Sequence, residues 1–167
     1  KLLDKEYCRV TSYEANVIAV SDDCDRSVLI NAETLKPISN DTFTSVQVGG
    51  NGKIIVSKDD IKFGLINIHG KTLIPFRYEA LKPIYYNFGH LDSIFIAKLN
   101  GKCGIIDLND NRILDFKYDE IYAGKTLFRC SLNNKWGIVD IHNQTIIPHE
   151  FDKIDFESET INRFVVM

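Results

Sequence analysis

The sequence predicts an all-β fold, an array of about four to five three-stranded antiparallel repeats that forms a propeller-like or half-barrel arc or a solenoid. An ungapped match of eighteen positions follows each of three glycines, Gly64, Gly104 and Gly137. Short alternating apolar segments are separated by turn residues, which is typical of strands. No segment longer than eight residues shows helical apolar spacing. The three glycines are 40 and 33 residues apart, and recurrence at such a spacing indicates a repeat architecture.

Each repeat is expected to contain three short strands. The first is apolar and alternating, at residues 54–57, 94–98 and 127–131. A tight turn follows, with Asn100-Gly101 or Asn133-Asn134, residues that accept the positive φ of a two-residue hairpin. The second strand carries the anchor glycine, at 103–108 and 136–141, and the third covers 72–75, 112–115 and 145–148.

We expect one domain over residues 1–167. Its parts are a partial repeat at 1–10, a degenerate repeat at 17–46 without the anchor glycine, repeats at 54–81, 94–121 and 127–154, and a partial repeat at 161–167. The chain thus runs from mid-repeat to mid-repeat. Either it belongs to a longer array, or Arg163–Val166 and Leu2–Asp4 meet to complete one unit.

The recurring positions have structural interpretations. The anchor glycine is expected to let an aromatic ring or a backbone segment approach closely, because it has no side chain. Trp136, Phe63 and Cys103 precede the glycine in successive repeats and are expected to be buried on the middle strand. Asp107 and Asp140 stand just before a turn, where an aspartate accepts hydrogen bonds from the following backbone.

These residues match a known pattern. Lys-Trp-Gly-Ile-Val-Asp at 135–140, followed by Ile-Ile-Pro at 146–148 and Phe-Asp at 151–152, resembles the WG-type β-repeat family of bacterial proteins. The resemblance covers about two full repeats at 94–154 and a further one with Phe63 in place of tryptophan. It implies a non-enzymatic repeat array whose motif is structural, with no catalytic residues.

Composition narrows the function classes. Twenty basic and twenty-three acidic residues give a net charge of -3, which argues against a nucleic-acid partner. No apolar run approaches the roughly 20 residues that span a bilayer, and no signal-peptide pattern opens the chain, so no membrane partner is expected. The four cysteines form no CxxC pair. We therefore expect a reduced, cytoplasmic protein.

Motifs that carry chemistry are not found. The four histidines (69, 90, 142 and 149) lack the spacing of metal ligands, so no metal site is expected. Asp22-Asp23-Cys24-Asp25 lacks the glycine and the terminal glutamate of a calcium loop and is interpreted as a hairpin tip. Gly49–Gly52 lacks the Lys-Ser/Thr that grips nucleotide phosphate. We expect neither enzymatic activity nor a cofactor.

Two features suggest a surface for a protein partner. The long connection at 82–92 is aromatic, which is typical of interface hot spots. The stretch 150–160 carries five acids against one lysine, which suits a basic partner. The candidate partner-binding residues are Tyr85, Tyr86, Phe88, His90, Glu150, Asp152, Asp155, Glu157 and Glu159.

The function expected from the sequence is a non-catalytic, protein-binding β-repeat module. One specific form is an immunity-type inhibitor that masks a basic toxin or enzyme. One alternative is a fragment of a larger scaffold or envelope array. Another is a small-ligand or carbohydrate binder.

Overall fold

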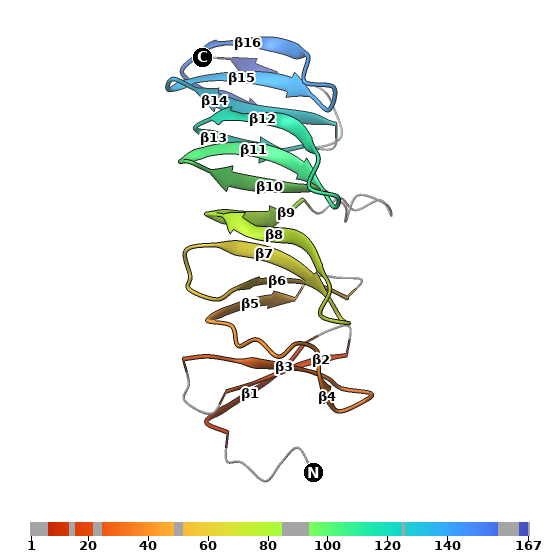
Figure 1. Cartoon of the computed structure of the whole chain (residues 1–167). Helices are drawn as coiled ribbons and strands as arrows, with labels where there is room; N and C mark the ends of the chain where they lie inside the picture. The colour runs from red at the N-terminus through yellow and green to blue at the C-terminus, as the bar shows by residue number, and fades with distance from the viewer. Residues whose placement is uncertain are drawn as a thin grey trace. The chain divides into compact units, whose positions relative to one another are not determined.

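A computed structural model describes residues 7–13, 16–21, 25–48, 52–84, 94–124, 126–156 and 164–166, with side chains left out at 12, 13, 155, 156 and 164–166. The chain divides into two compact units, Lys1–Leu81 and Lys82–Met167, and each is described by itself. Within the described residues the named elements are all short β-strands (Figure 1).

The first unit holds two antiparallel sheets. Sheet 1 has the order β1 (Arg9–Tyr13), β2 (Val17–Ser21), β3 (Val28–Asn31) and β4 (Lys36–Pro37). Sheet 2 has the order β5 (Ser45–Val48), β6 (Lys53–Ser57), β7 (Phe63–Asn67) and β8 (Thr72–Tyr78). In both sheets each strand pairs with its neighbour in sequence.

The second unit repeats this arrangement. Sheet 3 joins β9 (Ala80–Pro83), in which the boundary between the units falls, to β10 (Ile94–Leu99), β11 (Lys102–Asp107) and β12 (Arg112–Tyr118). Sheet 4 joins β13 (Glu120–Ala123), β14 (Leu127–Leu132), β15 (Lys135–Asp140) and β16 (Thr145–Phe151). β17 (Ile154–Phe156) pairs with β18 (Phe164–Val166).

The all-β repeat fold is confirmed, but each complete sheet has four strands rather than the predicted three. The additional strand is the short first one, such as β13, which pairs with β14 from Glu120↔Ser131 to Ala123↔Phe128. A four-residue segment carries too little alternation to be recognised from sequence. The third predicted strand is also longer, because β12 continues past Asp115 to Tyr118.

Each unit has its own apolar core. In the first unit Val17, Leu29, Phe43, Ile54 and Val56 form a buried cluster between sheets 1 and 2. In the second, residues of sheet 3 pack against residues of sheet 4 in a cluster that includes Ile105, Leu114, Tyr118, Phe128 and Cys130. Burial of these apolar surfaces is the main stabilising contribution to such a fold.

The anchor glycines allow the fourth strand to cross the third at close range. A Cβ built on Gly104 would lie 2.9 Å from the carbonyl oxygen of Leu114 and 2.9 Å from the Phe116 ring. The strand register shifts at this point, since Cys103 pairs with Tyr118 whereas Ile105 pairs with Leu114. Gly64 and Gly137 make the same contacts, with Phe76 and His149. The expected close approach of a ring is therefore confirmed.

Sheet 1 shows what happens without this glycine. Val28 pairs with Val20 in the register in which Gly64 pairs with Val56, so it occupies the anchor position of the degenerate repeat. β4 pairs with β3 only at Ile30↔Pro37 and Asn31↔Lys36, whereas β8 has seven residues. The chain beyond β4 still crosses β3, because Phe43 pairs with Ser27 through two backbone hydrogen bonds, as Tyr78 pairs with Phe63 in sheet 2. The repeat without the anchor glycine therefore has an interrupted fourth strand.

Turn chemistry follows the sequence prediction. Oδ1 of Asp107 accepts hydrogen bonds from the backbone N–H groups of Asn109 and Asn111, both at 2.8 Å. Asp140 does the same for His142 and Gln144. Asn100 and Asn133 have positive φ, as expected of their hairpin positions. Burial alone would raise the pKa of the Asp107 carboxyl, but the hydrogen bonds from Asn111 and Asn109 hold this pKa below its ordinary value.

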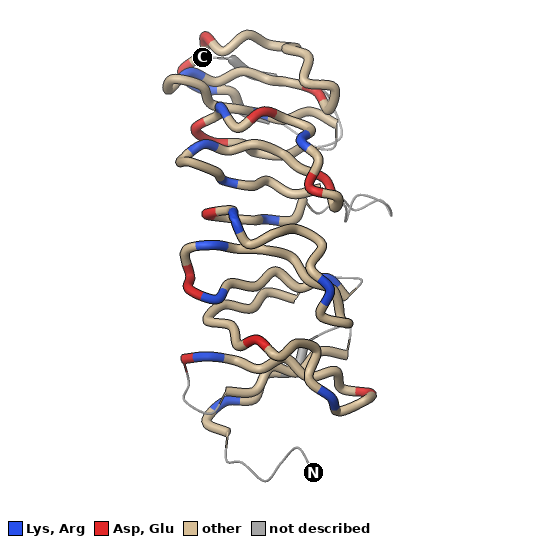
Figure 2. The backbone as a smooth tube through the Cα atoms, viewed as in Figure 1, with Lys and Arg blue, Asp and Glu red and all other residues tan. Residues whose placement is uncertain are grey.

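A lysine–aspartate pair recurs across the middle and last strands. Nζ of Lys102 lies 2.5 Å from Oδ1 of Asp119, and Nζ of Lys135 lies 2.5 Å from Oδ1 of Asp152. In each pair the lysine begins the third strand of its sheet, and the aspartate directly follows the end of the fourth strand, so the two side chains are neighbours. Both pairs are exposed to solvent, so each contributes little to stability. Figure 2 shows that charged residues lie mostly at strand ends and turns.

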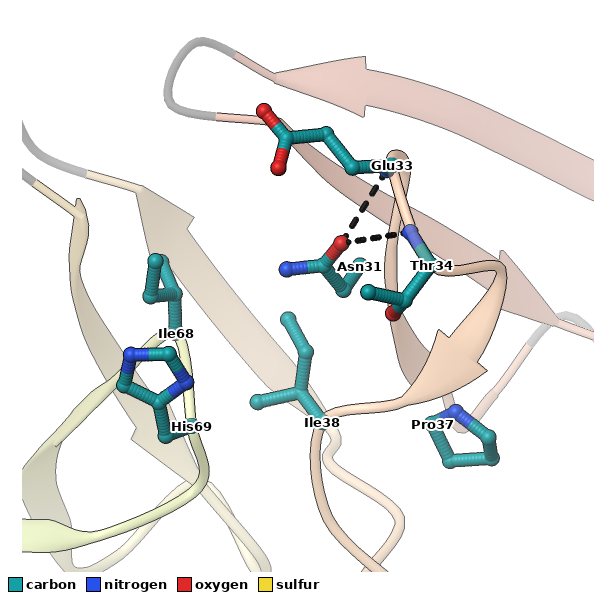
Figure 3. A pocket seen from close by; sticks show the side chains of 7 residues that line it. All are labelled: Asn31, Glu33, Thr34, Pro37, Ile38, Ile68 and His69. Atoms are coloured by element: carbon teal, nitrogen blue, oxygen red, sulfur yellow. Dashed lines mark hydrogen bonds between the residues drawn. The ribbon is translucent and has the colours of Figure 1, made fainter.

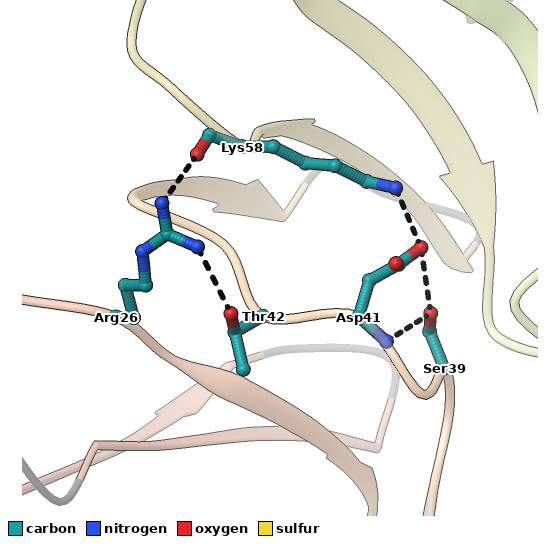
Figure 4. Close-up of polar contacts among 5 residues, drawn as sticks. All are labelled: Arg26, Ser39, Asp41, Thr42 and Lys58. Carbon is teal, nitrogen blue, oxygen red and sulfur yellow. Dashed lines mark hydrogen bonds and ion pairs between the residues drawn. The ribbon is translucent and has the colours of Figure 1, made fainter.

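Polar contacts join the segment between sheets 1 and 2 to the turn after β6 (Figure 4). Arg26 donates to Oγ1 of Thr42 and to the carbonyl oxygen of Lys58. Nζ of Lys58 lies 2.8 Å from Oδ2 of Asp41, and this hydrogen bond lowers the pKa of the Asp41 carboxyl. These contacts hold the segment that carries Phe43 into the core.

Three expectations are corrected or left untested. Trp136, Phe63 and Cys103 do occupy equivalent positions on the middle strands, but they are half-buried rather than buried. The cysteines are not all reduced, because Cys8 is disulfide-bonded. Leu2–Asp4 lie outside the described residues, and in the part of the chain that is described β18 pairs with β17 alone.

The glycine contact makes a first prediction. Gly104→Val should lower the free energy of unfolding of the second unit by about 2 kcal/mol or more, because the added side chain meets backbone as well as a ring. Urea unfolding measures the change. Val28→Ala, at the equivalent position in sheet 1, is the control and should cost about 1 kcal/mol. A loss below about 0.5 kcal/mol in Gly104→Val would show that β12 does not press on the glycine.

Candidate partner-binding surface

The predicted acidic surface is partly described. Glu150 on β16 is exposed, and Asp152 just beyond that strand is 81% exposed at its side chain. The carboxylate of Asp152 forms the recurring ion pair with Lys135. Glu150 does not take part in that recurring lysine–aspartate pair. Asp155 lies on β17, but its side chain is outside the described residues. The other candidates, Tyr85, Tyr86, Phe88, His90, Glu157 and Glu159, also lie outside the described residues.

The structure adds an aromatic and cationic group on sheet 4 beside these acids. Tyr122 pairs with Arg129, and the Arg129 guanidinium carbon lies 4.7 Å from the Tyr122 ring centre and 5.2 Å from that of Trp136. The two rings are 5.7 Å apart at their centres. Tyr122 is 49% exposed and Trp136 is half-buried. Tyr, Trp and Arg are the residues most enriched at interface hot spots.

Strand register places these side chains on one face of sheet 4. The pairs Tyr122↔Arg129, Arg129↔Ile138 and Ile138↔Ile147 form one cross-strand row. Trp136↔Phe151 begins a second row two residues along β15. We name the Trp136 face by its residues: Tyr122, Arg129, Trp136, Ile147 and Phe151.

The equivalent face of sheet 3 is covered, whereas the Trp136 face is covered only in part. Leu114 and Tyr118 are 0% and 1% exposed because sheet 4 packs over them. Their repeat equivalents on β16, Ile147 and Phe151, are half-buried. β17 covers some of the face, since Arg129 Nη1 donates to the carbonyl oxygen of Ile154. Ile147 and Phe151 therefore remain partly accessible to solvent.

His149 occupies the repeat position that is held by Phe76 in sheet 2 and by Phe116 in sheet 3. Its ring lies on Gly137 as Phe116 lies on Gly104, and it stacks on Tyr118 at 5.6 Å between ring centres. Its Nε2 atom is buried and has no hydrogen-bond partner among the described residues. Burial, and then the charge of Lys117, lower the pKa of His149. Burial likewise raises the pKa of Tyr118 to about 12.

The described residues contain no group of three or more His, Cys, Asp or Glu side chains placed to hold a metal ion. The two free cysteines are poor nucleophiles, because burial raises the pKa of Cys103 and raises that of Cys130 to about 12. Among the described residues no helix is long and apolar enough to cross a membrane.

A protein-family model matches two segments that carry the repeat motif. Residues 63–103 and 136–160 match the family model described as "WG containing repeat". These two segments are similar to WG-containing repeats. The match to the WG-containing repeat model begins at Phe63 and at Trp136, the residues directly before anchor glycines. No curated protein sequence matches the chain.

Solved structures resemble the fold of this chain. A eukaryotic initiation factor is 8% identical with a TM-score of 0.53, and the match covers 93% of this chain and 47% of that one. BamB from Moraxella catarrhalis is 10% identical, with a TM-score of 0.44 and coverage of 94% and 53%. The computationally designed Ika8 protein is 10% identical, with a TM-score of 0.46 and coverage of 95% and 55%. The chain therefore spans about half the length of these proteins.

Sequence reasoning missed the Trp136 face. Tryptophan beside glycine was assigned to the core, because a large aromatic residue at an alternating strand position is usually buried. Tyr122 falls in a short strand that was not predicted. A usable signal was available: the position of Trp136 holds Phe63 and Cys103 in the other repeats, a variation in size that a fully packed site does not tolerate.

The position of His149 predicts a pH-dependent stability. Its folded-state pKa is below the ordinary value of about 6.5, so protonation favours the unfolded chain. The free energy of unfolding should therefore fall as the pH drops from 7.5 through 6.5. His149→Phe should flatten this part of the curve in denaturant titrations at each pH. An unchanged slope would show that the imidazole charges freely in the folded state.

The burial of two cysteines predicts low thiol reactivity in the folded protein. Without reductant, a thiol reagent at pH 8 should find two reactive groups in the unfolded chain, Cys103 and Cys130. In the folded protein both should react slowly, since burial disfavours the thiolate. Four reactive groups in the unreduced, unfolded chain would contradict the disulfide at Cys8.

Proposed function

We propose that this chain is a non-catalytic module that binds another protein, with the Trp136 face as its contact surface. The observation that carries the proposal is the contrast between equivalent side chains: Tyr118 is fully buried by the next sheet, whereas Phe151 is half-buried. The Trp136 face is equivalent to a face of sheet 3 that another sheet covers. A bound partner would bury the apolar side chains that remain accessible on the Trp136 face.

Charge favours a basic partner. The chain carries a net charge of -3, and the exposed Glu150 lies on the same strand as Ile147 and Phe151. Acidic groups beside an apolar contact speed association with a basic protein and do little for the final affinity. A toxin or enzyme with a basic surface fits this chemistry, and the module would then act as an immunity-type inhibitor.

A larger repeat scaffold is the second candidate. β17 and β18 have the pairing of the first two strands of a repeat, because Ile154↔Val166 corresponds to Ile121↔Cys130. In that case the Trp136 face is covered by repeats of the same kind rather than by a foreign protein. The two candidates differ in the occupant of one surface, so one set of variants tests both.

The test measures affinity for the purified partner after capture from the source organism and identification by mass spectrometry. Trp136→Ala and Tyr122→Ala should each weaken binding by about 2 kcal/mol, which is roughly thirtyfold, mainly through faster dissociation. Glu150→Gln should instead slow association at low salt, and the difference should fade as salt is added.

Ile61→Ala is the control, because Ile61 is an exposed apolar residue (63%) of the first unit. It should leave the affinity unchanged. Thermal unfolding of each variant checks that the fold is intact. Full affinity in both aromatic variants would overturn the assignment of the Trp136 face, and self-association that the same variants abolish would favour the repeat scaffold.

A further inference from the structure

The first unit contains a pocket between a turn of sheet 1 and a turn of sheet 2. Its volume is about 350 Å³, at the lower end of the range for ligand sites. Figure 3 shows Asn31, Glu33 and Thr34 on one side, Ile68 and His69 on the other, and Ile38 between them. Ile38 is buried and gives the pocket an apolar floor. Pro37 completes the lining.

The shape of the pocket is set by backbone contacts. Oδ1 of Asn31 accepts hydrogen bonds from the backbone N–H groups of Glu33 and Thr34, each at 3.0 Å (Figure 3). On the opposite turn, a Cβ on Gly70 would lie 2.0 Å from the carbonyl oxygen of Ile38. The backbones of the two turns are therefore in close contact at Gly70.

Several polar groups in the pocket have no partner within the described residues. The Asn31 side chain uses only its oxygen, which leaves the Nδ2 group as a donor. Oε1 of Glu33 accepts from Asn16 at 2.5 Å, whereas Oε2 has no such bond. The Thr34 hydroxyl and the His69 ring also make no hydrogen bond in the described part of the chain. Polar groups that converge on an apolar floor are the usual composition of a binding site.

Charge decides the class of ligand. Among the described lining residues Glu33 is the one with a formal charge, when histidine is counted as neutral. The walls beside it are the aliphatic side chains of Ile38, Ile68 and Pro37. A lysine side chain matches both properties, since its methylene stem covers apolar surface while its ammonium group stays at a polar rim.

We infer that this pocket receives a lysine side chain of a partner protein, with Glu33 as the counter-ion and Ile38 and Ile68 against the methylene stem. This inference rests on the proposed protein-binding function and adds a second contact on the first unit. Asn31 and Thr34 line the same pocket, where they can bind the backbone carbonyl groups that flank the lysine.

The test titrates N-acetyl-lysine N-methylamide into the full chain and follows NMR signals. The methyl groups of Ile38 and Ile68 and the side-chain amide of Asn31 should shift and saturate. Glu33→Gln should weaken the binding about twofold to fivefold, as expected of an exposed ion pair, and added salt should have a similar effect. The variant keeps an oxygen for Asn16, so the turn should stay folded.

Matched controls separate the possible results. N-acetyl-norleucine N-methylamide has an apolar stem without the ammonium group and should bind at least twofold more weakly than the lysine probe. Glu120→Gln, at an exposed carboxylate of the second unit, should change nothing. Equal binding of both probes, or no effect of Glu33→Gln, would overturn the inference. Saturating shifts with glucose in place of the lysine probe would do the same and indicate a polyol site.

The purified partner completes the test. Glu33→Gln should weaken partner binding about twofold to fivefold, whereas Trp136→Ala should weaken it about thirtyfold. If the lysine probe binds but the partner ignores Glu33→Gln, the pocket takes free amines and the inference fails while the Trp136 face stands. If only Glu33→Gln weakens the partner, the pocket stands and the Trp136 face fails.

Discussion

The contact between an anchor glycine and the ring twelve residues later determines the shape of each complete repeat. The ring of Phe116 and the carbonyl oxygen of Leu114 both occupy space that a Cβ on Gly104 would need. The last strand can therefore shift its register, cross the middle strand and continue for seven residues. That extension carries Tyr118 into the core between sheets 3 and 4. The lysine–aspartate pair also depends on it, because it brings Asp119 beside Lys102.

The exceptions to this rule are informative. In sheet 1 a valine occupies the anchor position, and the last strand is reduced to Lys36–Pro37. In the same region the turn at Glu33 and Thr34 is exposed, and Ile38 is buried at the floor of the pocket. In sheet 4 the ring is His149, which fills the same space as phenylalanine but keeps a buried polar nitrogen. The pocket lies beside the interrupted last strand of sheet 1, and sheet 4 carries a histidine whose pKa is lowered by burial.

The two proposed contacts have different physical origins. The Trp136 face is a packing surface, equivalent to one that is buried in the preceding sheet, and its aromatic residues would contribute affinity by excluding water. The pocket at Glu33 is a polar site with an apolar floor and would contribute selectivity for a basic side chain. The Arg129 guanidinium lies against the rings of Tyr122 and Trp136, so the Trp136 face already contains a cation–π contact and is better suited to apolar groups than to a further cation.

The sequence by itself determined the all-β repeat, the register of the three anchor glycines, the aspartate turns and the WG resemblance. Those features depend on residues close together along the chain, such as Asp107 with Asn109 and Asn111, so local patterns carry them. Only the tertiary structure decided that β13 adds a fourth strand, that Trp136 is half-buried, and that Asn31 and His69 line one pocket. The physical reason is that burial depends on the neighbouring sheet. Leu114 and Ile147 share a repeat position, yet only Leu114 is covered by packing from the next sheet.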